Sequence, residues 1–157
     1  GGNDASCANG CDANCACAPC GAACAACGNV IGDPKLVASV KTKKDVGQLT
    51  FKALLPLGAF DATTPVTIRL EDDDSAPIVQ TRLAGIPGTG TKFQYKAKPD
   101  GVRQVQVQQK PSGLWQVSVK TKRWFTAAAA NLAASTTRLT VTVGTQCFTH
   151  AVTKKTD

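Results

Sequence analysis

The chain has few of the residues that catalysis and membrane insertion require. Its 157 residues include one histidine, His150, eight aromatic side chains and no methionine. The sequence shows no Ser/His/Asp set, no Cys/His set and no pair of carboxylates that would suit catalysis. The sequence therefore predicts no enzyme activity, no catalytic residue and no cofactor. Its apolar runs are shorter than the roughly 20 residues of a membrane-spanning helix, so we expect no membrane span.

Basic residues are missing from the first part of the chain. Residues 1–34 carry three acids and no base, whereas residues 35–157 carry 18 bases and 8 acids. Seven of the eight cysteines fall in the acidic part, separated almost only by Ala, Gly and Asn. The total length suits one ordinary domain. We therefore expect a cysteine-rich N-terminal arm, residues 1–34, that is largely irregular or short-helical, followed by a domain spanning residues 35–157.

The second part alternates apolar and polar residues in short segments that Gly and Pro interrupt. Trp115, Val117 and Val119 occupy every second position and alternate with polar residues. Leu139, Val141 and Val143 show the same alternation before Gly144. Such alternation without crossover helices is typical of antiparallel sheets. It predicts an all-β, two-sheet sandwich, Ig-like or jelly-roll-like. We expect about nine strands, near residues 36–44, 49–57, 65–70, 77–83, 93–95, 105–107, 114–121, 138–143 and 145–152, and one short helical connection within residues 125–134.

Lysines are frequent on the polar faces of these strands, for example Lys41, Lys96 and Lys120. Lysine on a strand hinders edge-to-edge aggregation and favours solubility, and these are the roles we expect. A nucleic-acid surface is not expected, because Trp115 and Phe93 fall at core parities and leave no platform for base stacking.

Two loops contain residues of the types that bind a Ca²⁺ ion or a phosphate. The acidic run Glu71–Ser75 offers oxygen ligands for Ca²⁺, but it lacks the spacing of a calcium loop and predicts a solvated turn. The glycine-rich loop Gly85–Gly90 has no lysine or helix after it to hold a phosphate. We expect it to be a flexible connection.

The cysteine segment carries the chemistry of the sequence and admits two classes of site. Cysteine pairs two residues apart are typical of structural metal or cluster sites, although here the pairs lie unusually close together. In a secreted protein the same density predicts a disulfide framework. A c-type haem is excluded, because glycine and not histidine follows each such pair. The candidate residues are Cys7, Cys11, Cys15, Cys17, Cys20, Cys24 and Cys27 for a metal site, and these seven with Cys147 for disulfides.

The odd number of cysteines in the arm constrains its pairing. If the arm is oxidised, at least one of its seven thiols must pair with Cys147 or with another molecule. Cys147 lies on the parity opposite Phe148, which places it on the outer face or margin of its sheet. Within the arm, Pro19 and Gly28 bracket a possible helix that presents a stripe of cysteines to a partner. Connectivity within or between chains stays open.

Residues 90–150 resemble the β domains of uncharacterised secreted bacterial proteins. The resemblance is carried by Phe93-Gln-Tyr-Lys, Gly113-Leu-Trp-Gln-Val-Ser-Val-Lys, Leu139-Thr-Val-Thr-Val-Gly and Cys147. It implies secretion and a β-sandwich, and no activity. The start at Gly1 rather than Met also predicts a processed, exported chain.

These features together predict a secreted structural protein, the subunit of an extracellular fibre or surface assembly. The acidic arm would dock on the basic body of the next subunit, head to tail, and disulfides would secure the contact. The partner is then a second copy of the chain. The alternative is a metal-binding or electron-transfer module built on the cysteine cluster. A third class, a carbohydrate- or surface-adhesion sandwich, would need exposed aromatic side chains, and few are available.

Overall fold

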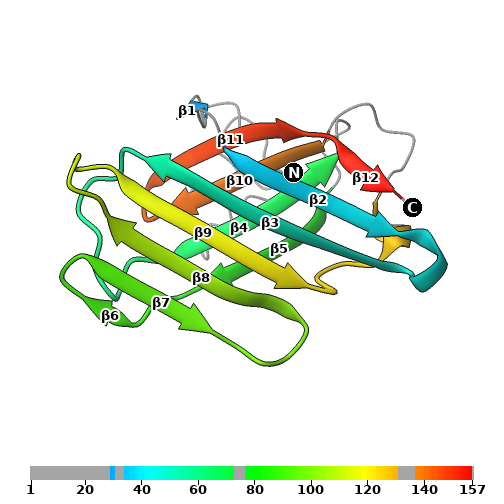
Figure 1. Ribbon diagram of the computed structural model, residues 1–157, viewed down its shortest axis with the longest axis horizontal. Helices are drawn as coiled ribbons and strands as arrows, with labels where there is room; N and C mark the ends of the chain where they lie inside the picture. Colours follow the sequence, from blue (N-terminus) through cyan, green and yellow to red (C-terminus); the bar gives the residue numbers. More distant parts are fainter. Residues whose placement is uncertain (1–28, 31–33, 73–76, 131–136, 157) are drawn as a thin grey trace, which may run out of the picture.

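The computed structural model describes residues 29–30, 34–72, 77–130 and 137–156 (Figure 1). These residues form two sheets packed face to face, which confirms the all-β sandwich. The elements are β1 (Asn29–Val30), β2 (Lys35–Lys41), η1 (Thr42–Lys44), β3 (Val46–Leu55), β4 (Val66–Asp72), β5 (Pro77–Leu83), β6 (Gly88–Thr89), β7 (Lys92–Lys96), β8 (Gly101–Gln109), β9 (Trp115–Lys122), η2 (Ala127–Ala129), β10 (Thr137–Val143), β11 (Gln146–Val152) and β12 (Lys154–Thr156).

The two sheets differ in size and in the strands that form their edges. The larger sheet has the order β12-β2-β3-β9-β8-β7-β6 and the smaller one β1-β11-β10-β4-β5. Figure 1 looks through the larger sheet onto the smaller one behind it. Pairing is antiparallel except at two edges, where β1 joins β11 and β12 joins β2 in parallel. Both exceptions bring together strands that lie far apart in the sequence.

All nine expected strands occur, and the structure adds three short ones, β1, β6 and β12. One expected boundary is wrong: the strand predicted to reach Lys44 ends at Lys41. Thr42–Lys44 form a 3-10 turn that closes with Asp45 in the left-handed region at φ 48°. The tight turn is what lets β2 reverse into β3.

The core lies between the sheets, at the positions that the alternation predicted. Val66, Ile68 and Leu70 of β4 are fully buried, as are Val117 and Val119 of β9. At one end of the core an aromatic cluster forms, in which the Phe60 and Phe93 rings meet edge to face at 4.9 Å and Trp115 lies 5.6 Å from Phe60. The expected core positions of Trp115 and Phe93 are confirmed.

The segment after β9 closes the other end of the sandwich. Gly47 and Phe125 form an isolated bridge, and the Phe125 ring lies over Gly47 so closely that an added Cβ would stand 2.0 Å from it. Only glycine fits there. The indole of Trp124 donates to the Thr81 hydroxyl at 2.8 Å. Of the helical connection expected within residues 125–134, the described part is the 3-10 turn η2, and no helix in the described part of the chain is long and apolar enough to cross a membrane.

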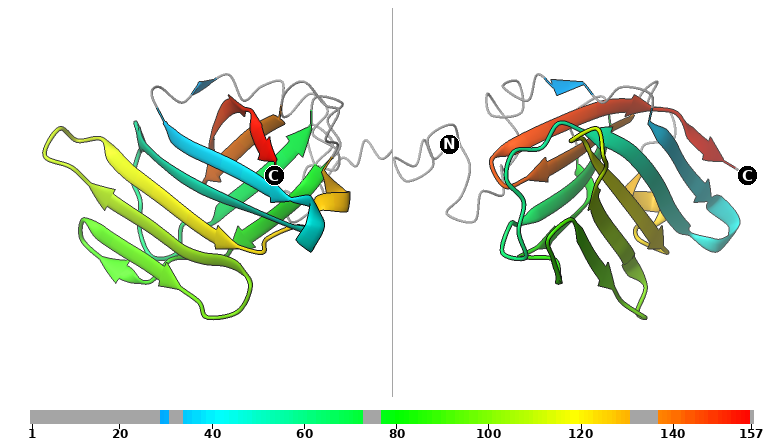
Figure 2. Two further views of the ribbon diagram at one scale, coloured as in Figure 1. Left: turned by 45° about the vertical axis from the view of Figure 1, so that its right-hand side comes forward. Right: turned by 60° about the vertical axis from the view of Figure 1, so that its left-hand side comes forward.

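A buried polar cluster joins the two sheets near the point where the chain passes from β11 to β12. Figure 2 shows the path of the chain there, with β12 following β11. Lys154 of β12, which belongs to the larger sheet, forms an ion pair with Asp72 of β4 in the smaller one. Thr137 lies between them: its hydroxyl donates to Asp72 at 2.9 Å and accepts from Lys154 at 2.8 Å. All three side chains are satisfied within this cluster, as burial requires.

Candidate functional site

The β10–β11 hairpin positions Cys147, the one predicted site residue that the structure describes. Gly144 takes φ 61° in the turn and Thr142 pairs with Cys147 across the two strands. Phe148 is buried in the core, whereas Cys147 is only half-buried on the opposite face of the smaller sheet. The predicted outward orientation of Cys147 is therefore confirmed.

The end of the predicted arm lies directly beside this cysteine. β1 follows the last cysteine of the arm by two residues and pairs in parallel with β11, with Asn29 opposite Phe148 and Val30 opposite Thr149. The backbone of the arm thus enters the smaller sheet next to Cys147. This pairing could not be predicted from the sequence, because two residues are too few to show an alternation.

Whether the seven arm cysteines form disulfides or bind a metal stays a prediction. Cys7, Cys11, Cys15, Cys17, Cys20, Cys24 and Cys27 lie outside the described residues, as does the possible helix between Pro19 and Gly28. Cys147 is not a free thiol. Among the residues that the structure describes, no three His, Cys, Asp or Glu side chains gather as a metal site would need.

The acidic run Glu71–Ser75 does not begin as the solvated turn that the sequence predicts. Glu71 and Asp72 belong to β4 and are only 2% and 3% exposed. Glu71 accepts from Arg69 Nε at 3.0 Å, and Arg69 Nη1 donates to Gln80 Oε1 at 3.1 Å. Buried carboxylates need such partners, and here cations of the chain supply them rather than Ca²⁺. Residues 73–75 lie outside the described ranges.

The glycine-rich loop is also more structured than expected. Ile86 is fully buried, and Gly88–Thr89 form the short edge strand β6 against β7. Gln94 donates its backbone N–H to the Pro87 carbonyl at 2.8 Å. The prediction of a purely flexible connection is wrong, because Ile86 anchors the segment in the core.

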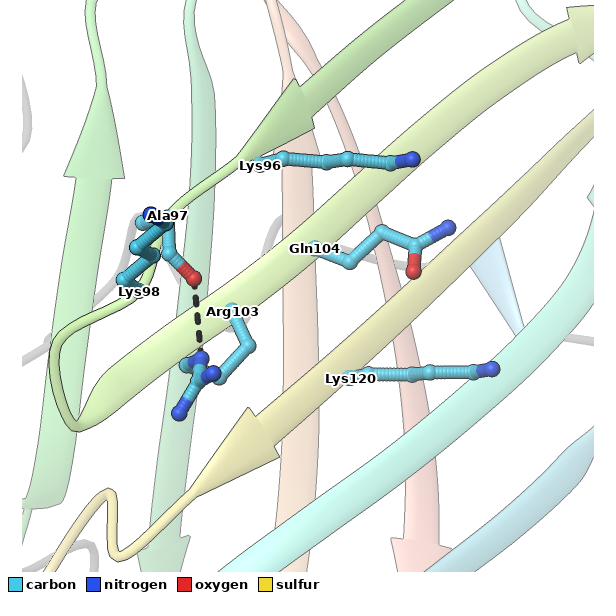
Figure 3. A pocket seen from close by; sticks show the side chains of 6 residues that line it. All are labelled: Lys96, Ala97, Lys98, Arg103, Gln104 and Lys120. Carbon is cyan, nitrogen blue, oxygen red and sulfur yellow. Dashed lines mark hydrogen bonds between the residues drawn. The ribbon is translucent and has the colours of Figure 1, made fainter.

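A basic hollow opens on the outside of the larger sheet, where β7, β8 and β9 run side by side (Figure 3). It has a volume of about 430 Å³ and is lined by Lys96, Ala97, Lys98, Arg103, Gln104 and Lys120. In Figure 3, Lys96, Gln104 and Lys120 extend side by side in one direction from three neighbouring strands. Four cations and no carboxylate line the hollow, so it is suited to an anionic group.

A β-bulge shapes one wall of this hollow. The β8–β9 register shifts between Val102 and Gln104, so that Arg103 is the extra residue. The guanidinium of Arg103 turns back, and its Nε donates to the Ala97 carbonyl at 2.8 Å. This hydrogen bond ties the turn between β7 and β8 to β8 and leaves the remaining guanidinium donors available.

Comparison with known proteins adds no constraint. No protein-family model, no curated protein and no solved structure matches the chain. The function therefore has to be argued from the geometry of this molecule.

Proposed function

We propose that the chain is an exported structural protein, the subunit of an extracellular fibre or surface assembly. A disulfide-rich N-terminal arm docks head to tail on the neighbouring subunit. The observation that carries the proposal is the position of β1, which brings the end of the arm to β11 beside Cys147. Added β-strands are a common way for one chain to hold another, because main-chain hydrogen bonds require no particular side chains.

The same pairing serves within a chain or between chains. β1 is an edge strand whose partner, β11, is remote in the sequence, so a second copy of the chain can supply an identical strand. Exchange of an identical element converts an intramolecular contact into an intermolecular one without new chemistry. When the donor and the acceptor surfaces lie on different parts of the subunit, the contact propagates head to tail.

A two-residue strand cannot hold subunits together by itself. Its few hydrogen bonds contribute about 0.5–1.5 kcal/mol each, whereas association costs about 4–15 kcal/mol in lost translational and rotational freedom. A covalent bond to Cys147 holds the two chains together even though the hydrogen bonds alone do not offset the cost of association. The odd number of cysteines in the arm supports the same step, because in a fully oxidised arm at least one thiol has to pair outside residues 7–27.

The test is mass spectrometry of native material that is alkylated and denatured before any reductant is added. We expect all eight cysteines to be protected and covalent masses at multiples of the chain, seen also as a ladder on a non-reducing gel that collapses with reductant. Cys147→Ser should abolish the ladder, because the arm then has one unmatched thiol per chain, which can link two chains at most, so no covalent species larger than a dimer should remain. Thr149→Ser, on the same face of the same strand, should leave it intact.

Two results would overturn the proposal. A monomeric mass with all cysteines protected would confine the bridges to one chain. Eight alkylated thiols on a monomer would mean a reduced protein, and stoichiometric bound metal in that material would establish the metal-binding alternative.

A further inference from the structure

The outer face of the larger sheet is a continuous basic surface without a carboxylate. Following the strand register from β12 to β7, the outward positions are Lys, Gln, Ser, Thr, Val and Leu, with Gly101 opposite Lys122 and Arg103 at the bulge of β8. We call this surface the lysine–glutamine face. Its exposed lysines are Lys35, Lys41, Lys52, Lys92, Lys96, Lys120, Lys122 and Lys155, and its glutamines are Gln48, Gln94, Gln104, Gln106, Gln108 and Gln116.

Edge protection does not explain this face. Lys52 lies on β3 and Lys120 on β9, and both strands are central in the seven-stranded sheet. A central strand has no open edge to defend. Lys35 and Lys52 stand directly opposite each other, an arrangement of like charges that destabilises a sheet. Edge protection therefore does not account for these residues, and of the two expected roles only solubility applies to them.

The charge of the face is also not neutralised from within. None of the eight lysines forms an ion pair with a carboxylate of the described residues. Of the described acids, Glu71 and Asp72 are buried with their own partners, and Asp45, Asp61 and Asp100 lie in turns and loops. The basic hollow between Lys96, Lys98 and Lys120 lies at one end of the same surface.

We propose that the lysine–glutamine face binds a linear acidic polysaccharide, a polymer of uronate sugars. Ammonium groups pair with carboxylates, and the intervening glutamine amides both donate to and accept from sugar hydroxyls. Adjacent strands lie about 4.8 Å apart, close to the length of one sugar unit, so successive rows meet successive sugars. Val37 and Leu54, which are 44% and 47% exposed on this face, offer apolar contact to the flat sides of the rings.

Nucleic acid fits the face less well. Arg103 lies in the hollow at one end of the face, where its Nε donates to the Ala97 carbonyl, and the outward rows carry no aromatic ring on which a base could stack. A broad sheet also cannot enter the major groove, which admits a helix or a two-stranded ribbon.

The experiment measures binding of the intact, oxidised chain to three probes at low salt. The probes are an alginate oligosaccharide, a neutral dextran oligosaccharide of equal length, and a short DNA duplex. We expect alginate to bind with an affinity that falls as salt is added, and dextran not to bind. Alginate should bind more tightly than DNA at equal charge. The binding does not depend on assembly, so it is expected also for Cys147→Ser.

Matched variants locate the site. The triple variant Lys52→Gln, Lys96→Gln, Lys120→Gln removes three charges from the face and should weaken alginate binding by about tenfold. The control Lys43→Gln, Lys44→Gln, Lys110→Gln removes three charges from turns and should change it by less than about twofold. Thermal unfolding should show both variants folded, because all six side chains point away from the core.

Three outcomes would overturn the proposal: no alginate binding at low salt, equal weakening by the two triple variants, or tighter binding of DNA than of alginate. The second would show attraction to the net charge of the chain rather than to this face. The third would make the surface one for nucleic acid.

Discussion

Charged side chains on the outer faces of the two sheets differ in burial and in pairing. On the smaller sheet the outward side chains Arg69 and Glu71 are 6% and 2% exposed and pair with each other at 3.0 Å. On the larger sheet the outward lysines are exposed and have no described carboxylate beside them. Buried charge must be matched inside the molecule, whereas exposed charge of one sign is left for something outside it. The comparison separates a face that stabilises the fold from one that is available for binding.

The largest expected effect comes from the cluster that joins the two sheets. Asp72→Asn keeps the shape of the side chain but leaves the buried Lys154 ammonium without its carboxylate, which should lower the free energy of unfolding by about 3–5 kcal/mol. Urea unfolding measures this. The double variant Asp72→Leu, Lys154→Met should recover most of the loss, because a well-packed apolar pair replaces both charges.

Lys155→Met is the matched control for this cluster. Lys155 adjoins Lys154 but points to the lysine–glutamine face, so its substitution should change stability by no more than about 0.5 kcal/mol. An equal loss in Lys155→Met would show that β12 and not the ion pair carries the effect.

Glu71→Gln tests the buried charge of the smaller sheet alone. The amide leaves Arg69 with a weaker partner, although Gln80 still accepts from Nη1, and we expect a loss of about 2–3 kcal/mol in urea unfolding. A loss below about 0.5 kcal/mol would mean that this face is as tolerant as the lysine–glutamine face.

Lys52→Glu tests the exposed face in the opposite direction. Lys35 lies directly opposite, so the substitution converts repulsion into attraction and should raise the free energy of unfolding by about 0.5 kcal/mol. The same variant should weaken alginate binding. A rise in stability together with a loss of binding would show that the native lysine serves a partner and not the fold; unchanged alginate binding would remove Lys52 from the proposed surface.

The smallest effect concerns Asp61, in the loop before β4. Hydrogen bonds from the Thr63 hydroxyl and backbone N–H hold the pKa of the Asp61 carboxyl below its usual range. Because the folded pKa is lowered, its contribution to stability is present above the unfolded pKa of about 3.9 and is lost as pH falls through the folded pKa. NMR titration should place Asp61 below that value, and Thr63→Val should move it back up. No shift in Thr63→Val would contradict the assignment.

The strands and the core could be predicted because the alternation is local. Val117 and Val119 lie inward simply because their parity matches that of Trp115, whatever the rest of the sheet does. Cys147 could be placed on the outer face for the same reason, since the parity of Phe148 settles it. β1 and β12 could not be foreseen, because each is too short to alternate and is held by a remote partner.

The buried acids were mispredicted because composition alone says that Glu and Asp face water. Arg69 and Glu71 share a parity in one strand, which was a usable signal for a same-face ion pair. The partnership of Asp72 with Lys154, 82 residues later, carried no such signal. The lysine–glutamine face was visible as single lysines, but its continuity depends on the order of the strands, which alternation does not determine.

The parallel edges β1 and β12 bear on the order in which the chain folds. Each of these strands pairs with a segment more than a hundred residues away in the sequence. The entropy lost in closing so long a loop is offset only once the antiparallel strands in between have formed. They are therefore expected to form last, and until then β2 and β11 have open edges. Under the assembly proposed above, a newly made chain passes through a stage in which the edge beside Cys147 accepts either its own β1 or that of a neighbour. In that scheme the local concentration of chains at that moment, rather than the stability of the finished sandwich, decides between monomer and polymer.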